Sequence, residues 1–257
     1  MVTHPSSARL ALRNLPAFSP VASKLMTMLR REQVNFKDAS ELIKSDAGMS
    51  AELLRLANSP ITGIRFPSTS VLHALSILGV KRVASLTATL SIGKMLRPVS
   101  KLPLMRRCWR HNLATALIAR VKSAEYDVDS EDGYMFGLLA GIGTLALLVS
   151  EPAAYCQLVR QATEEDIPLE TLEAQFFGFD NREAGAQLVS DWHLPPDLLK
   201  VFSPGNDSNL AHLILRADFE AARMGFGVIG VHMVDTTDPK AFDIAERVNW
   251  VEQELGI

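Results

Sequence analysis

The hydrophobic positions of this chain recur every three or four residues over most of its length, which is the period of amphipathic helices. Ser19 is suited to cap a helix whose first turn contains Pro20. Ser70 can cap a helix that ends at Gly79, because glycine accepts the left-handed conformation common just beyond a helix. The pattern predicts helices over residues 19–29, 38–44, 45–58, 70–79, 81–95, 104–124, 133–150, 168–178, 181–192, 209–223 and 239–255, and a short turn or helix from Pro195.

Two of these helices have an apolar stripe that predicts which side chains are buried. Leu113, Leu117 and Val121 share one face of the helix expected over 104–124. In the C-terminal helix the apolar positions are Phe242, Ile244, Val248 and Val251. Only residues 228–234 have strand character. We therefore predict an all-α fold with one short strand near the C-terminus.

The most apolar stretch runs from Gly133 to Ser150 and contains no charged residue. Its length is close to the lower limit for a membrane span. Glycines at every fourth position let a neighbouring helix approach closely, and several polar groups are easier to satisfy in a protein core than in lipid. We predict a single buried central helix, on the evidence of Gly133, Gly137, Gly141, Tyr134, Thr144 and Ser150.

Pro98 and Pro103 enclose a short polar connection that is the best candidate for a boundary between two helical lobes. The division predicted from it is an N-terminal extension at 1–14, a lobe of about five helices at 15–97, a second lobe at 98–225 and a tail with a helix at 226–257.

The composition is that of an ordinary globular chain, with 257 residues and 47% hydrophobic residues, enough to fill a sizeable core. The net charge of −3 provides no general attraction for polyanions, so nucleic acid is not expected as a partner, nor is a membrane. Two cysteines and an N-terminus without a continuous apolar segment fit a reducing compartment. We expect a cytoplasmic location.

Short motifs for enzyme chemistry give little support to a catalytic site. Residues 225–230 match GxGxxG, but they follow a helix and lead into the strand-like segment, the reverse of the order in dinucleotide-binding folds. Cys108 and His111 lie three residues apart on one helix face, and a buried thiol beside a hydrogen-bonded histidine is favoured over a nucleophile and its base. The remaining histidines show no metal-ligand spacing. No catalytic residue and no cofactor is predicted.

A basic run without any acidic residue extends from Lys94 to Arg110. Arg106 and Arg107 within it could contact phosphate groups. The favoured interpretation is a solvated connector that faces the acidic segment from Glu125 to Asp132.

Several separated motifs stand in a fixed order along the chain. They are Leu15–Ala22, Ser45–Ser59 and Ala74–Gly79 in the first half, and Trp109–His111, Gly137–Leu139, Gly143, Gly185–Ala186 and Trp192–Pro195 in the second. Over about Leu15 to Gly225 this series resembles an HDOD domain, a helical signalling domain related to HD-type phosphohydrolases and found in bacterial regulatory proteins. The resemblance implies an HD-like helical core in the second lobe.

The chain departs from the related hydrolases where their divalent metal is held. By this resemblance His111 and Asp218 match the first and last ligands, whereas Ala140 and Gly141 replace the His-Asp pair and Asn181 replaces another histidine. One histidine and one aspartate are too few for a stable open metal site. We therefore expect no bound metal and no phosphohydrolase activity, and we expect His111 and Asp218 to be a buried polar pair whose members satisfy each other or the backbone.

The resulting hypothesis is a non-catalytic signalling module that binds a partner protein. Candidate contact residues are Arg55, Asn58 and Ser59, although Asn58 could equally cap its own helix. The alternative is a nucleotide-binding or residual phosphohydrolase-like domain with a pocket between the lobes and with Arg106 and Arg107 on phosphate. A third hypothesis is an output adaptor in a DNA-linked pathway that does not itself touch DNA.

Overall fold

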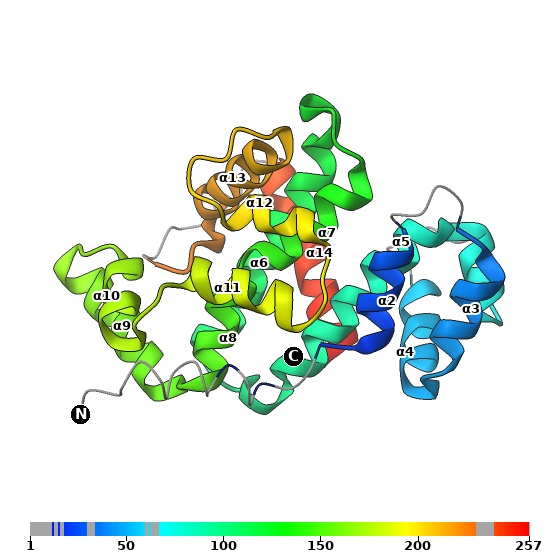
Figure 1. Ribbon diagram of the computed structural model, residues 1–257, viewed down its shortest axis with the longest axis horizontal. Helices are drawn as coiled ribbons and strands as arrows, with labels where there is room; N and C mark the ends of the chain where they lie inside the picture. Colours follow the sequence, from blue (N-terminus) through cyan, green and yellow to red (C-terminus); the bar gives the residue numbers. More distant parts are fainter. Residues whose placement is uncertain are drawn as a thin grey trace.

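The computed structural model describes residues 12, 15, 18–29, 34–59, 62, 67–229 and 239–256. These residues form helices and connecting turns only, so the predicted all-α class is confirmed for them (Figure 1). Most of the strand predicted at 228–234, and most of the N-terminal extension, lie outside the described residues.

The N-terminal helices pack against one long helix, α5. Figure 1 shows α2, α3 and α4 gathered around the first part of α5, on the side of the molecule away from α9 and α10. Side chains cap the starts of these helices as the sequence predicts: the Ser19 hydroxyl accepts from the backbone of Ala22, and Ser70 accepts from that of His73. The bounds are α2 Pro20–Met28, α3 Phe36–Lys44, α4 Ala47–Ala57 and α5 Val71–Leu96.

Gly79 divides α5 into two helical segments that follow one another at a kink. Its φ of 78° is in the region that side chains with a Cβ rarely adopt. The two helices predicted over 70–79 and 81–95 are therefore both present. The second segment is almost entirely buried, since it passes into the interior between the two groups of helices.

The remaining helices form a second, larger group around α6. A 3₁₀ turn, η2, joins α5 to α6 at the position of the predicted lobe boundary; the division into two lobes stays a prediction. The elements are η2 Arg97–Val99, α6 Pro103–Lys122, η3 Ser123–Tyr126, α7 Ser130–Ala140, α8 Ile142–Ser150, α9 Pro152–Glu165, α10 Leu169–Phe177, α11 Asn181–Asp191, η4 Pro196–Leu198, α12 Leu199–Phe202, α13 Asn209–Ala221, the π turn η5 Ala222–Phe226 and α14 Pro239–Leu255.

The apolar stretch over 133–150 is two helices, and the prediction of a single helix is wrong. Helix α7 ends and α8 begins at Gly141, whose φ and ψ of −92° and 16° are not helical. Glycine has a low helix propensity, and the neighbouring side chain of Asn112 leaves no room for a Cβ at this position. Helix α9 was not predicted either; its buried positions Tyr155, Leu158, Val159 and Ala162 alternate with charged and polar residues.

Two predicted core positions are on the surface. Val121 is 72% exposed at the end of α6, whereas Leu113 and Leu117 are buried as expected. Phe242 is 61% exposed on α14, and the buried stripe of that helix is instead Ala241, Ile244, Val248, Val251 and Leu255. The sequence pattern identified the centre of each apolar stripe, but which positions at its edge are covered depends on the neighbouring helices.

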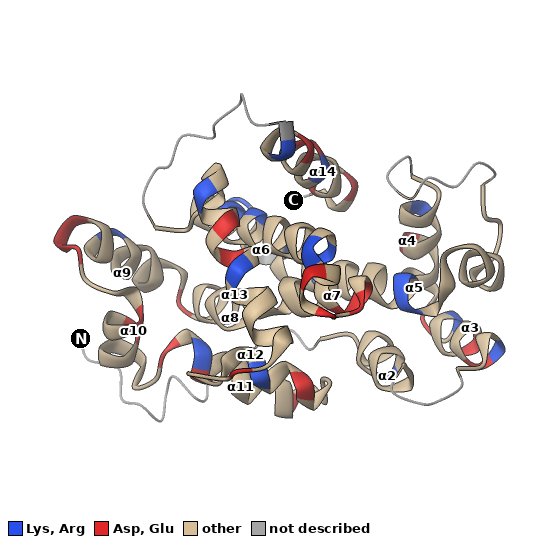
Figure 2. Ribbon diagram, turned by 90° about the horizontal axis from the view of Figure 1, so that it is seen from above, with Lys and Arg blue, Asp and Glu red and all other residues tan. Residues whose placement is uncertain are grey.

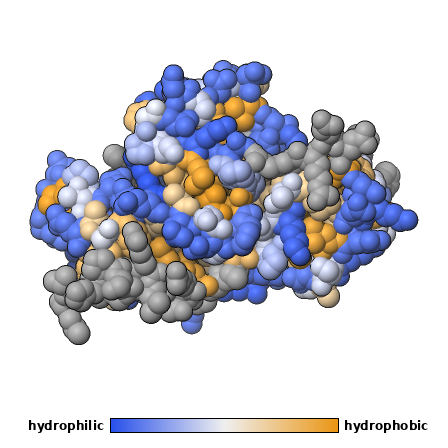
Figure 3. Space-filling model, in the orientation of Figure 1, coloured by the Kyte–Doolittle hydropathy of each residue, from blue (hydrophilic) through white to orange (hydrophobic). Residues whose placement is uncertain are grey.

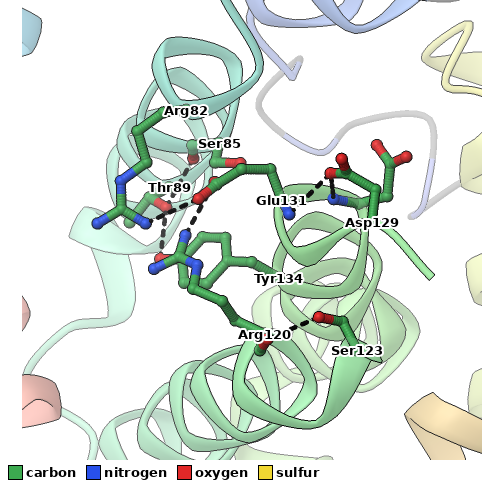
Figure 4. A network of polar contacts seen from close by, with 9 residues as sticks. Arg82, Ser85, Thr89, Arg120, Ser123, Asp129, Glu131 and Tyr134 are labelled. Carbon is green, nitrogen blue, oxygen red and sulfur yellow. Dashed lines mark hydrogen bonds and ion pairs between the residues drawn. The ribbon is translucent and has the colours of Figure 1, made fainter. Parts of the chain in front are cut away.

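A partly buried polar network joins α5 to α6 and α7 (Figure 4). The Glu131 carboxylate accepts from Arg82 at 3.1 Å and from Arg120 at 3.0 Å. The Arg120 guanidinium lies 3.9 Å from the centre of the Tyr134 ring, and the Tyr134 hydroxyl is 3.0 Å from that of Thr89. One carboxylate thus bonds to two guanidiniums where three helices meet, and one of the two positive charges stays uncompensated within the trio.

Two described segments, Val71–Leu96 and Ser130–Ser150, are long and apolar enough to cross a bilayer by length and composition alone. Buried fractions of 67% and 72% show that both lie mainly inside the protein. Core helices of this kind pass the same test, so the finding is weak evidence for a membrane span. In Figure 3 the described surface on this face is mostly hydrophilic, with small separate apolar patches.

Candidate functional site

The positions that match metal ligands in the related hydrolases come from four parts of the second group of helices. Helix α6 packs against α7, α8 and α13, and α8 packs against α11. Close packing of α8 on α11 depends on Gly143, because a Cβ there would lie 1.8 Å from the backbone oxygen of Asn181. The fold therefore brings the ends and faces carrying these positions into one region.

His111 and Asp218 bond to each other, which is one of the two arrangements expected for them, but Asp218 is not buried as predicted. The Nε2 atom of His111 on α6 is 2.7 Å from Oδ1 of Asp218 on α13. The His111 side chain is 14% exposed and that of Asp218 is 53% exposed, so the pair lies at the edge of the core. The other ring nitrogen of His111, Nδ1, is buried and has no hydrogen-bond partner among the described residues.

The Asn112 side chain fills the space beside Gly141, where the related hydrolases have their His-Asp pair. A Cβ built on Gly141 would lie 2.1 Å from Oδ1 of Asn112 and 2.7 Å from its Cγ. Asn112 is 3% exposed, and its amide donates to the backbone oxygen of Leu138 at 3.5 Å. A side chain at position 141 would therefore require Asn112 to move within the core.

Asn181 belongs to a different polar cluster. Its side-chain amide donates to Oε2 of Glu173 at 2.7 Å, and its backbone N–H donates to the same oxygen at 2.9 Å. The Tyr155 hydroxyl donates to the other oxygen of this fully buried carboxylate. Burial raises the pKa of Glu173, and the bonds from Tyr155 and Asn181 oppose that shift. Burial, together with the Glu173 charge, also raises the pKa of Tyr155.

These residues do not fit a divalent metal centre of the hydrolase type. His111 and Asp218 bond to each other, Asn112 fills the space beside Gly141, and Asn181 is held by Glu173. Within the described ranges no three His, Cys, Asp or Glu side chains are grouped closely enough to hold a metal ion. Such a centre needs several imidazoles and carboxylates around one cation.

Cys108 is not placed or ionised as a nucleophile. Its side chain is 1% exposed, and burial raises the pKa of its thiol to about 12. A thiol with this pKa remains protonated near neutral pH and is a poor nucleophile.

The basic run between Lys94 and Arg110 pairs with other acids than the sequence predicts. Lys94 and Arg97 contact Glu52 on α4, at 3.2 and 3.3 Å. Arg106 and Arg110 contact Glu252 on α14, at 3.3 and 2.6 Å. The expectation that the run faces the acidic segment is therefore wrong for these four residues.

The acidic segment itself pairs with other cations. Its partners come from the start of the second part of α5 and from the end of α6, namely Lys81 for Asp129 and Asp132, Arg82 and Arg120 for Glu131, and Lys122 for Glu125. The pairing depends on how the helices cross, which separates the acidic segment from the basic run.

The three residues predicted to contact a partner have contacts inside the chain. The Asn58 side chain donates to the Ser68 backbone oxygen at 3.0 Å and accepts from the Ser68 N–H at 2.6 Å, which fastens the segment before α5. Ser59 is 6% exposed and its hydroxyl donates to the backbone of Leu56. Arg55 is half exposed and is paired with Glu254 of α14. Their role in partner binding stays a prediction.

A groove of about 760 Å³ lies between the N-terminal helices and the end of α11. Phe18 stacks on Trp192 in its wall, with ring centres 5.6 Å apart, and the Ser23 hydroxyl lies 2.8 Å from the backbone oxygen of Trp192. The charged residues of its lining include Lys24 and Asp191. The predicted phosphate contacts Arg106 and Arg107 are not part of the lining, so the structure does not bring them to this groove.

Sequence reasoning missed two residues that define these regions. Asn112 fills the vacated ligand position, and only its place directly after His111 could have drawn attention to it. Glu252 of α14 is only 1% exposed, and its carboxylate forms ion pairs with Arg106 and Arg110. Its position four residues after Val248, on the apolar side of α14, is the sequence signal that could have found it.

Comparison with known proteins supports the resemblance. The family model of the HDOD domain matches residues 15–205. An uncharacterized protein of Treponema pallidum (strain Nichols) is 21% identical over 188 residues, which are 72% of this chain and 36% of that protein. The chain thus spans little more than a third of this relative.

Solved structures with the same fold cover nearly the whole chain. An HDOD domain protein of unknown function from Geobacter sulfurreducens has a TM-score of 0.71 at 20% identity, over 98% of this chain and 93% of that one. A presumed phosphohydrolase from Shewanella amazonensis SB2B has a TM-score of 0.70 at 22% identity, over 99% and 90%. At these identities the likeness establishes the fold alone.

Proposed function

Since this chain belongs to the HDOD domain family, we propose that it is a non-catalytic bacterial regulatory module, which acts in cytoplasmic signal transduction by binding a partner protein. The family membership supports the regulatory role. The described helices pack around one continuous core, which includes the region where the related hydrolases hold their metal.

The observation that carries this proposal is the position of Asn112. Its Oδ1 lies 2.1 Å from where a Cβ of residue 141 would be, so the place of a ligand carboxylate contains a buried amide instead. An amide supplies no negative charge, and the ligands left over are one histidine and one aspartate that already bond to each other. Lowering the pKa of a metal-bound water needs a cation held by several such ligands.

The test measures metal content and hydrolysis on the full chain. The protein is incubated with Mn²⁺, Fe²⁺ or Mg²⁺, dialysed and analysed for bound metal, and is then assayed with bis(p-nitrophenyl) phosphate and with cyclic dinucleotides. We expect substoichiometric metal and the same background rate for wild type, His111→Ala and the control His212→Ala, an exposed histidine paired with Asp207. Stoichiometric metal, or turnover that only His111→Ala abolishes, would overturn the proposal.

A second experiment tests the obstruction itself. The triple variant Ala140→His, Gly141→Asp, Asn181→His restores the missing ligand types, and a fourth change, Asn112→Ala, provides space. We expect the quadruple variant to be more stable than the triple variant and to bind Mn²⁺ more tightly, because the new carboxylate no longer meets the Asn112 amide. Equal stability and equal metal affinity in both variants would show that Asn112 is no obstacle.

The groove beside Trp192 supports a second candidate function, binding of a nucleotide. Its volume of about 760 Å³ is in the range of small-molecule sites, and its lining combines an aromatic pair with Lys24 and with the carboxylates of Asp38 and Asp191. Calorimetric titration with mononucleotides and cyclic dinucleotides, on wild type and Lys24→Ala, tests it. Saturable binding that the variant loses would favour this function over the first, and absence of heat at saturating nucleotide would exclude it for the compounds tested.

A further inference from the structure

The C-terminal helix α14 covers a face formed by α6 and by the end of α4. Its buried side chains, Ala241, Ile244, Val248, Val251 and Leu255, follow one another at intervals of three and four residues. This spacing is typical of a helix that lays a narrow apolar stripe into a groove between other helices. Figure 2 shows α14 at the periphery of the molecule, beyond α6.

Arginines on the covered face hold carboxylates of α14. Both oxygens of Glu252 receive bonds at 3.3 Å from Arg106, and one of them receives a bond at 2.6 Å from Arg110. Arg110 also donates to the Asn249 side chain at 2.6 Å. At the end of the helix, Arg55 of α4 bonds to Glu254. Two arginines of α6 therefore hold the side of α14 that carries Asn249 and Glu252, and an arginine of α4 holds Glu254 at the end of the helix.

The Glu252 carboxylate is almost fully buried, with a side-chain exposure of 2%. A buried carboxylate is tolerated only where cations and hydrogen bonds compensate its lost hydration, and the compensation is specific to that place. The hydrogen bond to Glu252 raises the pKa of Arg106. The face is thus shaped for a helix that carries carboxylates beside an apolar stripe.

The covered face and the covering helix belong to different parts of the chain. Helices α4 and α6 lie within the HDOD match at 15–205, and α14 lies beyond it. Because α14 belongs to the same chain, it binds this face at a high effective concentration. When the ion pairs separate, water solvates the released charges, and this hydration offsets much of the lost attraction. Such a contact suits a cover that a competing helix can displace.

We propose that this face, with Arg55, Arg106 and Arg110, is the docking surface for an acidic amphipathic helix of a partner protein, and that α14 occupies it as a built-in competitor. The inference rests on the proposed function as an interaction module, and it identifies the surface and the chemistry of the partner. The partner helix carries apolar residues at intervals of three and four and two carboxylates near its C-terminal end.

The experiment measures binding of a labelled synthetic peptide with the sequence of residues 239–255 to the full chain by fluorescence anisotropy. Two variants release α14 in different ways: Glu252→Lys repels the arginines, and Val248→Asp breaks the apolar stripe. Circular dichroism and thermal melting verify that the rest of each variant stays folded. We expect the peptide to bind both released variants more tightly than the wild type, in which α14 competes.

Arginine substitutions in the Val248→Asp background then test the charged contacts. Arg110→Ala is expected to weaken peptide binding about tenfold or more, since it leaves the peptide's buried carboxylate short of a partner. Arg107→Ala is the matched control, because Arg107 is exposed on the same helix and has no ion pair within the described residues. Equal losses in the two variants, or no binding to either released variant, would overturn the proposal.

Two further results would also overturn it. One is that a peptide with the same charges but without the apolar stripe, or a short oligonucleotide, binds as tightly as the peptide of residues 239–255. This would show that the face binds anions in general. A stable dimer of the released variants in light scattering would make a second copy the occupant. Metal content and hydrolysis are measured on the same variants, so that an activity appearing there counts against the proposed function and a failure of peptide binding counts against the docking surface alone.

Discussion

Glu131 is the residue whose neutralisation should reveal most about how α5 is held to α6 and α7. Its carboxylate lies between Arg82 and Arg120, with side-chain exposures of 17% for Glu131 and Arg120 and 20% for Arg82. Burial lowers the pKa of Arg120, the Arg82 charge acts in the same direction, and the Glu131 charge opposes both. The variant Glu131→Gln keeps the shape and removes the charge, which leaves two guanidiniums facing each other (Figure 4).

The expected loss follows from this partial burial. Removing one partner of a fully buried ion pair costs about 3–5 kcal/mol, and an exposed pair contributes about 0–1 kcal/mol. Because the three side chains keep about a fifth of their exposure, we expect the free energy of unfolding to fall by about 2–3 kcal/mol. For a chain of this size the melting temperature should fall by about 4–12 °C.

The assay is urea denaturation followed by circular dichroism, with Asp243→Asn as the control. Asp243 pairs with Arg247 on the exposed side of α14, with side-chain exposures of 54% and 44%. This control should change the free energy of unfolding by less than about 0.5 kcal/mol. If Glu131→Gln is as mild as the control, the argument that one carboxylate compensates two partly buried cations is wrong.

Three other predictions concern the core. The raised pKa of Glu173 means that the folded protein binds the Glu173 proton more tightly than the unfolded chain does. The resulting stabilisation is complete below the ordinary pKa of 4.5 and is lost as the pH rises through the pKa of the folded state. Denaturation at several pH values should therefore show the stability of Glu173→Gln rising relative to that of the wild type over this range, and a difference that does not change with pH would refute the argument. Gly143→Ala should give an unstable or insoluble protein, because its Cβ would lie 1.8 Å from a backbone oxygen of α11. The control Gly48→Ala should be neutral or stabilising by up to about 1 kcal/mol, because its Cβ would be 3.4 Å from the nearest atom outside its own helix backbone. Thermal melting of both variants is the measurement, and equal melting temperatures would contradict the prediction. A thiol reagent should label Cys156 in the native protein and should reach Cys108 only after denaturation. The measurement is the number of labelled thiols before and after addition of urea. Rapid labelling of both thiols in the native protein would be inconsistent with the burial of Cys108.

Local features of the chain determined most of the helices and several of their ends. Ser19 and Ser70 cap helices because a side-chain oxygen can satisfy a free backbone N–H wherever the chain enters a helix. Gly79 and Gly178 end helical segments at φ values of 78° and 83°, since glycine adopts that conformation without a steric cost. These events depend on neighbours within a few residues, so the sequence predicts them directly. The pairing of His111 with Asp218 was one of the two arrangements that the family resemblance led us to expect.

Tertiary packing decided the break at Gly141 and the pairing of the charges. The apolar stretch is continuous in sequence, and the Asn112 side chain of another helix occupies the space beside its middle residue. The basic run pairs with Glu52 and Glu252, which lie far from it in sequence, and the acidic segment that seemed its natural partner is held elsewhere. An ion pair or a steric conflict between distant residues depends on how helices cross in three dimensions, and the period of a single helix carries no information about that crossing.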